Sequence, residues 1–94
     1  MPIKEKTFVH KGLEEIFYTG RSKRIGAKYL RRIRIVLDYL DGATGPNDLQ
    51  GVLGFHALIG NRDGQYAMRI SGNWRLTFRF EQGDVIDIDF EDYH

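Results

Sequence analysis

The stretch Trp74-Arg75-Leu76-Thr77-Phe78-Arg79-Phe80 alternates apolar and polar residues without interruption. This period of two is typical of a strand with one buried and one polar face. A second alternating run, Ile86–Phe90, follows a short turn. Because a slip of one residue would move every apolar side chain to the wrong face, the two apolar sets are expected to pair. The expected pairs are Phe80–Ile86, Phe78–Ile88 and Leu76–Phe90 on the apolar face, and Arg79–Asp87, Thr77–Asp89 and Arg75–Glu91 on the polar face.

The run Tyr66–Ile70 precedes this strand and is joined to it by a Ser71-Gly72-Asn73 turn. Matching apolar residues here sets Arg69 directly opposite Arg75. Like charges that face each other across two strands destabilise a sheet, so a compensating group is expected. An ion-pair network with Glu91 is one solution. An anionic ligand is the other, because the planar guanidinium group binds two oxygens of a phosphate at once.

Outside these hairpins, apolar residues at helical spacing predict one helix over residues 12–18 and a longer one over residues 27–41. Gly20 ends the first helix, and Gly45-Pro46 prevents the second from continuing. Strands are predicted over residues 7–10, 52–58, 66–70, 74–80 and 85–90. This order predicts a single α+β domain over residues 1–94. Its two N-terminal helices are expected to pack on one face of a four- to five-stranded antiparallel sheet.

The chain has 94 residues, no cysteine and a formal net charge of +1. This length allows one modest core, and the lack of cysteine excludes disulfides and thiolate metal sites. No apolar run is long enough to span a membrane, and the start lacks the apolar stretch of a secretory signal. We therefore expect a cytoplasmic protein without a membrane partner.

The charge is unevenly distributed along the chain. Residues 21–34 contain seven Lys or Arg and no acid, whereas residues 81–94 contain six acids and no Lys or Arg. A basic run of this kind attracts polyanions such as nucleic acid. The alternative interpretation is a solvated helix face that the acidic C-terminal segment partly neutralises.

Titratable side chains are predicted to gather near the paired arginines. On the expected register His56 lies on the polar face with Arg75, and Asp92-Tyr93-His94 follow directly from the last strand. Cleavage of an RNA phosphodiester by its own 2′-hydroxyl needs a base, an acid and cations for the phosphorane, but no metal. These residue types supply all three. Acids two residues apart on a strand, in contrast, are poorly spaced to chelate one ion, so no metal and no cofactor are expected.

Three segments of the sequence resemble HigB-type toxins, which are RelE/ParE-like proteins of bacterial toxin–antitoxin modules and are also known as plasmid-maintenance killer proteins. The segments are Phe8–Leu13, Gly72–Phe80 and Asp92-Tyr93-His94. The resemblance covers the whole chain and implies two helices against an antiparallel sheet and ribosome-dependent cleavage of mRNA. It also implies a helix-turn-helix, HigA-like antitoxin that restrains the toxin and represses the operon. Operator DNA is then contacted only through the antitoxin.

Carried over by position, the resemblance implies an active site made of His56, Arg75, Asp92, Tyr93 and His94. Arg75, helped by Arg69, is expected to stabilise the phosphorane. His94 or Asp92 would transfer protons, with Tyr93 and His56 positioning or assisting.

The chain departs from the family at Ile59, because the family often has a lysine three residues after the histidine. Arg62 or Arg69 is expected to replace that charge. Cations on two regions of the chain are expected to contact mRNA and ribosomal RNA: Lys23, Arg24, Lys28, Arg31, Arg32, Arg62 and Arg69.

Two other functions remain open at this point. The first is a non-catalytic, ParE-like toxin that poisons a protein such as DNA gyrase, which would tolerate removal of the imidazoles. The second is a small regulatory module whose basic helix and acidic tail bind a partner protein.

Overall fold

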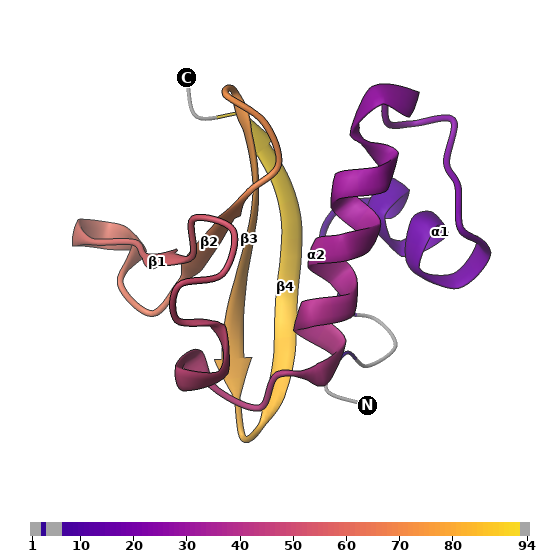
Figure 1. The fold of residues 1–94 in the computed structure, drawn as a ribbon. Coiled ribbons are helices and arrows are strands. Elements are labelled where there is room, and N and C mark those ends of the chain that lie inside the picture. Colours follow the sequence, from indigo (N-terminus) through magenta and orange to yellow (C-terminus); the bar gives the residue numbers. More distant parts are fainter. Residues whose placement is uncertain (1–2, 4–6, 93–94) are drawn as a thin grey trace.

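The computed structural model describes residue 3 and residues 7–92. Two helices cover one face of a four-stranded antiparallel sheet with the strand order β1-β2-β3-β4 (Figure 1). The helices are α1 (Lys11–Thr19) and α2 (Leu30–Gly42), and the strands are β1 (His56–Ala57), β2 (Tyr66–Arg69), β3 (Trp74–Glu81) and β4 (Asp84–Asp92). Three short 3-10 turns lie between them: η1 (Ala27–Tyr29), η2 (Pro46–Leu49) and η3 (Gly60–Arg62). This confirms the predicted fold class.

Both helices form where the apolar spacing predicts them. His10 caps α1, because its Nδ1 accepts a hydrogen bond of 3.0 Å from the backbone N–H of Gly12. Gly20 ends that helix with a φ of 88°, a conformation that favours glycine. α2 buries one stripe against the sheet, made of Ile33, Val36, Leu37 and Leu40. No helix among the described residues is both long and apolar enough to cross a lipid bilayer.

The β2–β3 hairpin has the predicted register. Met68 pairs with Leu76 and Tyr66 with Phe78, and Arg69 stands directly opposite Arg75. Met68 and Leu76 are fully buried in the core under the helices. Since side chains alternate along a strand, Arg69 and Arg75 lie on the other face of the sheet.

The β3–β4 register is as predicted at one end and wrong at the other. Leu76 pairs with Phe90, Thr77 with Asp89 and Arg75 with Glu91, but a bulge follows, so that Arg79 pairs with Ile86 rather than Asp87. Asp87 supplies the extra residue and has a φ of 54°, which Asp tolerates better than most residues. Beside this bulge the backbone N–H of Ile88 donates to the Thr7 carbonyl at 2.9 Å.

Two of the predicted strands are mostly absent. Only His56–Ala57 of the expected strand 52–58 pairs with β2, because Leu53 and Gly54 form a turn with φ values of 46° and 71°. The expected strand 7–10 is reduced to a parallel bridge between Phe8 and Ile88. Residue 3 forms a second bridge of this kind, with Val85. The sheet therefore has four strands, and Ile3 and Phe8 each form an isolated bridge with β4.

Candidate active site on the open face of the sheet

A row of three charged residues crosses the face of the sheet that the helices leave open. Arg69 of β2, Arg75 of β3 and Glu91 of β4 lie in register on neighbouring strands. Arg69 is exposed, whereas the Arg75 side chain retains only 16% of its accessible surface. The two like charges that the sequence set against each other are therefore on one surface, and Glu91 lies beside them.

Glu91 is the centre of a compact ion-pair network. Its two carboxylate oxygens accept hydrogen bonds of 2.6 and 2.7 Å from Nη1 and Nη2 of Arg62. Thr77 Oγ1 also donates to Glu91, and Nη2 of Arg75 lies 3.8 Å from Oε1. The bonds from Arg62, and then that from Thr77, lower the pKa of Glu91 from 4.5 to about 2, although its burial acts in the opposite direction.

The turn around η3 carries Arg62 over this face. The Nε of Arg62 donates to the Gln65 side chain at 2.7 Å, which fixes the guanidinium above the sheet. Thr77 has no exposed surface although it lies on the face opposite to the helices. Arg62, expected to bind RNA or to replace the missing lysine, is therefore engaged with Glu91. Ile59, at the position of that lysine, is 84% exposed.

The turn at Leu53–Gly54, which the sequence pattern did not predict, contacts both His56 and Arg69. The Leu53 carbonyl accepts from the Arg69 backbone N–H at 3.0 Å, and His56 Nδ1 lies 2.9 Å from the Gly54 carbonyl. A Cβ atom on Gly54 would approach Arg69 Cβ to 3.3 Å, so the turn packs closely on this arginine. Because a carbonyl only accepts, Nδ1 carries the proton of that bond and Nε2 of the exposed ring remains available for a substrate.

His56 shares the face of Arg75 but does not adjoin it. It pairs with Ala67, which pairs with Thr77. Two strand spacings, about 10 Å, therefore separate the backbone of His56 from that of β3. Ala67 and Thr77, the two residues in register with His56 on β2 and β3, have no exposed surface.

Asp92 is exposed and pairs with Trp74 at the end of the sheet. Because side chains alternate along β4, the Asp92 side chain is on the opposite face of the sheet from Glu91 and Arg75. It could approach Arg75 only around the end of the strand. Tyr93 and His94 lie outside the described residues. Of the five residues implied for catalysis, the structure thus places Arg75 and His56 on one face and Asp92 at its border.

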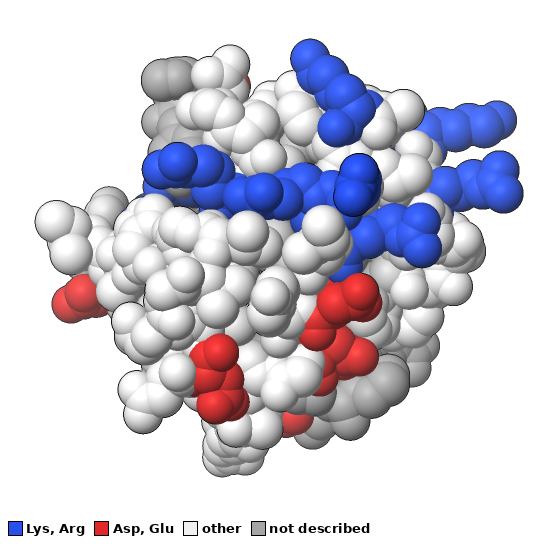
Figure 2. Space-filling view, viewed as in Figure 1, with Lys and Arg blue, Asp and Glu red and all other residues white. Residues whose placement is uncertain are grey.

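The basic start of α2 lies at the same end of the sheet. Arg32 Nε donates to the backbone carbonyl of Arg69 at 3.1 Å, and the ring of Tyr29 packs 6.1 Å from Trp74 and 5.8 Å from Phe90. Lys and Arg side chains gather mainly in the upper half of the molecule in Figure 2, where α2 begins and β4 ends, and acidic side chains lie mainly below. The predicted basic surface is therefore adjacent to the row formed by Arg69, Arg75 and Glu91.

The other predicted RNA-binding cations lie at the start of α2 and on the loop that precedes it. Lys28 and Arg31 are exposed there, and Lys28 lies over the Tyr29 ring. Lys23 and Arg24 lie on the preceding loop, where Arg24 forms an exposed ion pair of 3.4 Å with Glu15.

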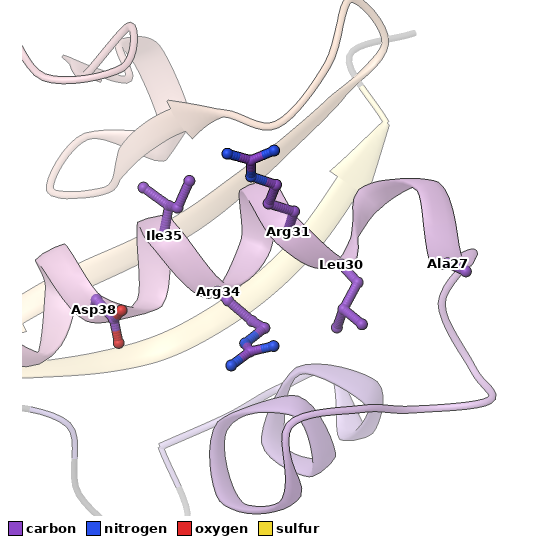
Figure 3. Close-up of a pocket in the computed structure, with 6 residues that line it drawn as sticks. All are labelled: Ala27, Leu30, Arg31, Arg34, Ile35 and Asp38. Atoms are coloured by element: carbon purple, nitrogen blue, oxygen red, sulfur yellow. The ribbon is translucent and has the colours of Figure 1, made fainter.

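A shallow depression on the outer side of α2 is separate from the open face of the sheet (Figure 3). Leu30 and Arg34 point toward α1, whereas Arg31 and Ile35 point to the other side of the helix. Arg31 thus lies on the same side of α2 as the exposed side chain of Ile35, an arrangement that suits contact with another macromolecule more than catalysis. Within residues 3 and 7–92, no three Asp, Glu or His side chains are grouped so that they could hold a metal ion.

The sequence offers Glu91 as a partner that neutralises one of the opposed arginines, and the ion pair of 3.8 Å with Arg75 confirms this partnership. The sequence signal for this partnership was the register, which places one carboxylate beside two opposed arginines. The bidentate pair with Arg62 could not be anticipated, because 29 residues separate the partners and the connecting turn has no periodic pattern.

The fold is that of a known class of small toxins. A YoeB-YefM complex from Staphylococcus aureus contains a chain that aligns with a TM-score of 0.59 at 24% identity, covering 98% of this chain and 94% of that one. A YoeB/ParE toxin from Agrobacterium tumefaciens aligns with a TM-score of 0.60 at 16% identity, covering 97% and 99% of the two chains. At such identities the likeness concerns the fold alone.

The sequence defines the family more narrowly. Residues 6–94 match the HigB-like toxin family, described as the RelE-like toxin of the type II toxin–antitoxin system HigB. A protein from Proteus vulgaris named Endoribonuclease HigB is 37% identical over 90 residues, which cover 95% of this chain and 98% of that protein. The chain belongs to the HigB-like toxins, as the sequence resemblance implied.

Proposed function

We propose that this chain is an endoribonuclease that cleaves mRNA on the ribosome as the toxin of a type II toxin–antitoxin module. The observation that carries the proposal is the pairing of Arg69 with Arg75 on the open face of the sheet. Two opposed guanidinium groups form an unfavourable pair that a phosphate stabilises. The name of the Proteus vulgaris relative, Endoribonuclease HigB, supports RNA as the source of that phosphate.

The cleavage proceeds by attack of the RNA 2′-oxygen on the adjacent phosphorus. A new P–O bond forms, the bond to the 5′-oxygen breaks, and the products are a 2′,3′-cyclic phosphate and a 5′-hydroxyl end. Arg75, assisted by Arg69, stabilises the charge of the phosphorane. One proton leaves the 2′-hydroxyl and another is delivered to the 5′-oxygen; His94 or Asp92 carries these transfers, and Tyr93 and His56 position or assist. No metal or cofactor enters this scheme.

The basic surface at the start of α2 would bind the ribosomal RNA that surrounds the mRNA. Arg32 contacts the backbone of Arg69, Lys28 and Arg31 lie near it at the start of α2, and Lys23 and Arg24 lie on the loop between α1 and α2. Phosphate contacts of this kind carry little sequence information and weaken as the salt concentration rises. A helix-turn-helix, HigA-like antitoxin would restrain the toxin and contact operator DNA, and the toxin would act in the cytoplasm.

The proposal is tested by adding the purified chain to a reconstituted translation system and mapping the new RNA 5′ ends. We expect cleavage of translated mRNA only, with ends that can be ligated to an adaptor only after phosphorylation. Arg75→Ala and His94→Ala should remove the cleavage, whereas Arg79→Ala, on the same face of β3, should retain it.

Two results would overturn the proposal. Unchanged cleavage by both Arg75→Ala and His94→Ala would remove the assigned site, and 5′-phosphate ends would exclude attack by the 2′-hydroxyl. In cells that express the chain, DNA damage without loss of mRNA would instead indicate a toxin that poisons DNA gyrase.

A further inference from the structure

The carboxylate of Glu91 is fully occupied and therefore cannot act as the base of the reaction. Oε1 accepts from Arg62 and faces Arg75, while Oε2 accepts from Arg62 and Thr77. A carboxylate held in this way remains ionised at neutral pH and is a poor proton acceptor. Its place beside Arg75 on the neighbouring strand needs another explanation.

We propose that Glu91 is a positioning residue for Arg75, and that Arg62 is the counter-charge that prevents Glu91 from cancelling the positive charge of Arg75. The inference rests on the proposed function, because it concerns how the same site binds and orients a phosphate. It differs from a role of Arg62 in contacting RNA, since Arg62 then acts through Glu91.

Arg62 and Arg75 bind the carboxylate of Glu91 with different strength. Arg62 forms two parallel hydrogen bonds of 2.6 and 2.7 Å, the strongest arrangement that an arginine makes with a carboxylate. Arg75 lies 3.8 Å away, within reach of the charge but beyond hydrogen-bond distance in this ion pair. Glu91 thus attracts the guanidinium group of Arg75, but it does not bind the N–H donors of that group in the way that it binds those of Arg62.

Electrostatics explain why the second arginine is needed. An unneutralised carboxylate at this distance would lower the affinity of Arg75 for a phosphate. Only 22% of the Glu91 side chain is exposed, so water screens its charge poorly. The charge of Arg62 offsets that of Glu91, and Gln65 holds Arg62 in place at 2.7 Å.

The experiment measures kcat and KM for cleavage of ribosome-bound mRNA by four variants: Arg62→Met, Glu91→Gln, the double variant and the control Glu81→Gln. In Arg62→Met, Glu91 should turn to Arg75 and raise KM about tenfold, the size expected for residues coupled in one network. Glu91→Gln should lower kcat by about the same factor without raising KM, because Arg75 loses its orientation but not its charge. Glu81 is an exposed acid at the far end of β3, and its variant should leave both constants unchanged.

The double variant gives the sharpest result. We expect its KM to return to that of Glu91→Gln, because the carboxylate that Arg62 neutralises is no longer present. A KM that stays raised in the double variant means that Arg62 contacts RNA directly, and this would overturn the inference. An unchanged KM in Arg62→Met would overturn it as well.

Folding of each variant is followed by circular dichroism, because a purely structural role would reduce the folded fraction and leave KM unchanged. If Glu91→Gln does not fold, Arg62→Met still tests the inference, because an unchanged KM in that variant overturns it. Cleavage by the wild-type protein distinguishes failure of the proposed function from failure of the inference about Glu91 and Arg62. If it does not cleave mRNA, the proposed function fails. If it cleaves mRNA and the KM pattern is absent, only the role of Glu91 and Arg62 fails.

Discussion

The two ends of β3 use the same residue type in opposite ways. At one end Arg75 faces Arg69 in a regular register, with Glu91 on its other side and the basic start of α2 nearby. At the other end Arg79 faces a bulge and forms an ion pair of 3.6 Å with Asp87, in which the two side chains are 40% and 54% exposed.

This difference between the two ends of β3 separates charges that serve only the fold from charges that can bind a ligand. An exposed pair such as Arg79–Asp87 contributes little to stability and leaves no charge for a ligand. The row of Arg69, Arg75 and Glu91 contains more positive than negative charge, which a sheet that only had to fold would avoid. We therefore expect substitutions at the two ends to act on different properties of the protein.

The largest difference is expected when each arginine is replaced by alanine. Arg75→Ala should lower the cleavage rate at least about 100-fold, the loss seen when a group that stabilises transition-state charge is removed. Arg79→Ala should leave the rate unchanged. Rates are measured on translated mRNA by primer extension, with the amount of folded protein checked by circular dichroism. Equal losses in both variants would mean that the two ends are not functionally distinct.

A fall in pH should lower the free energy of unfolding through Glu91, at the end of the sheet that carries Arg75. The pKa of Glu91 is about 2 in the folded protein and 4.5 as the ordinary value, so its ionised form favours folding. This contribution is present above the ordinary pKa and is lost as the pH falls through the folded pKa. It amounts to at most about 3 kcal/mol.

Urea unfolding of the wild type and of Glu91→Gln measures this contribution. The free energy of unfolding should differ most near about pH 6, and the difference should shrink steadily between about pH 5 and pH 2 as the carboxylate is protonated. Arg62, Arg75 and Thr77 face Glu91 and are present in both proteins. A difference that does not change with pH would show that the charge of Glu91 does not stabilise the fold.

The sequence predicted the regular parts of the fold because they follow from periodicity. The helices and the β2–β3 register depend on one apolar face that must be buried, and a shift of one residue would destroy it. The bulge at Asp87 and the turn at Leu53–Gly54 could not be found in this way. They depend on φ values of 54°, 46° and 71°. At the bulge Val85 and Ile86 are both apolar, so the sequence alone does not decide which of them enters the core, and the structure buries Val85.

The same limit applies to the site. The opposed arginines were predictable, because the register of two strands fixes them. The Arg62–Glu91 pair depends on how the turn around η3 folds over the sheet, and this follows from tertiary contacts. The prediction of a catalytic cluster that includes Tyr93 and His94 remains a prediction.

Replacing Arg69 tests the cost of the opposed arginines themselves. Arg69→Ala should raise the free energy of unfolding by about 0.2–1 kcal/mol, since like charges that face each other across strands are destabilising. The same variant should cleave mRNA more slowly, because Arg75 loses its helper. Urea unfolding and primer extension measure the two effects on one sample. A variant that is less stable than the wild type would show that the Arg69 side chain contributes more by packing against Gly54 than it costs by repulsion.

The smallest effect is expected at the bulge. Asp87→Asn removes the ion pair with Arg79 but suits the same positive φ, so it should lower the free energy of unfolding by no more than about 0.5 kcal/mol. Asp87→Val should cost about 1–2 kcal/mol, because a Cβ-branched residue is strained at this φ. Urea unfolding compares the two variants, and cleavage should be the same in both. Equal losses of stability would mean that the ion pair, and not the backbone conformation, determines which residue is favoured at this end of the sheet.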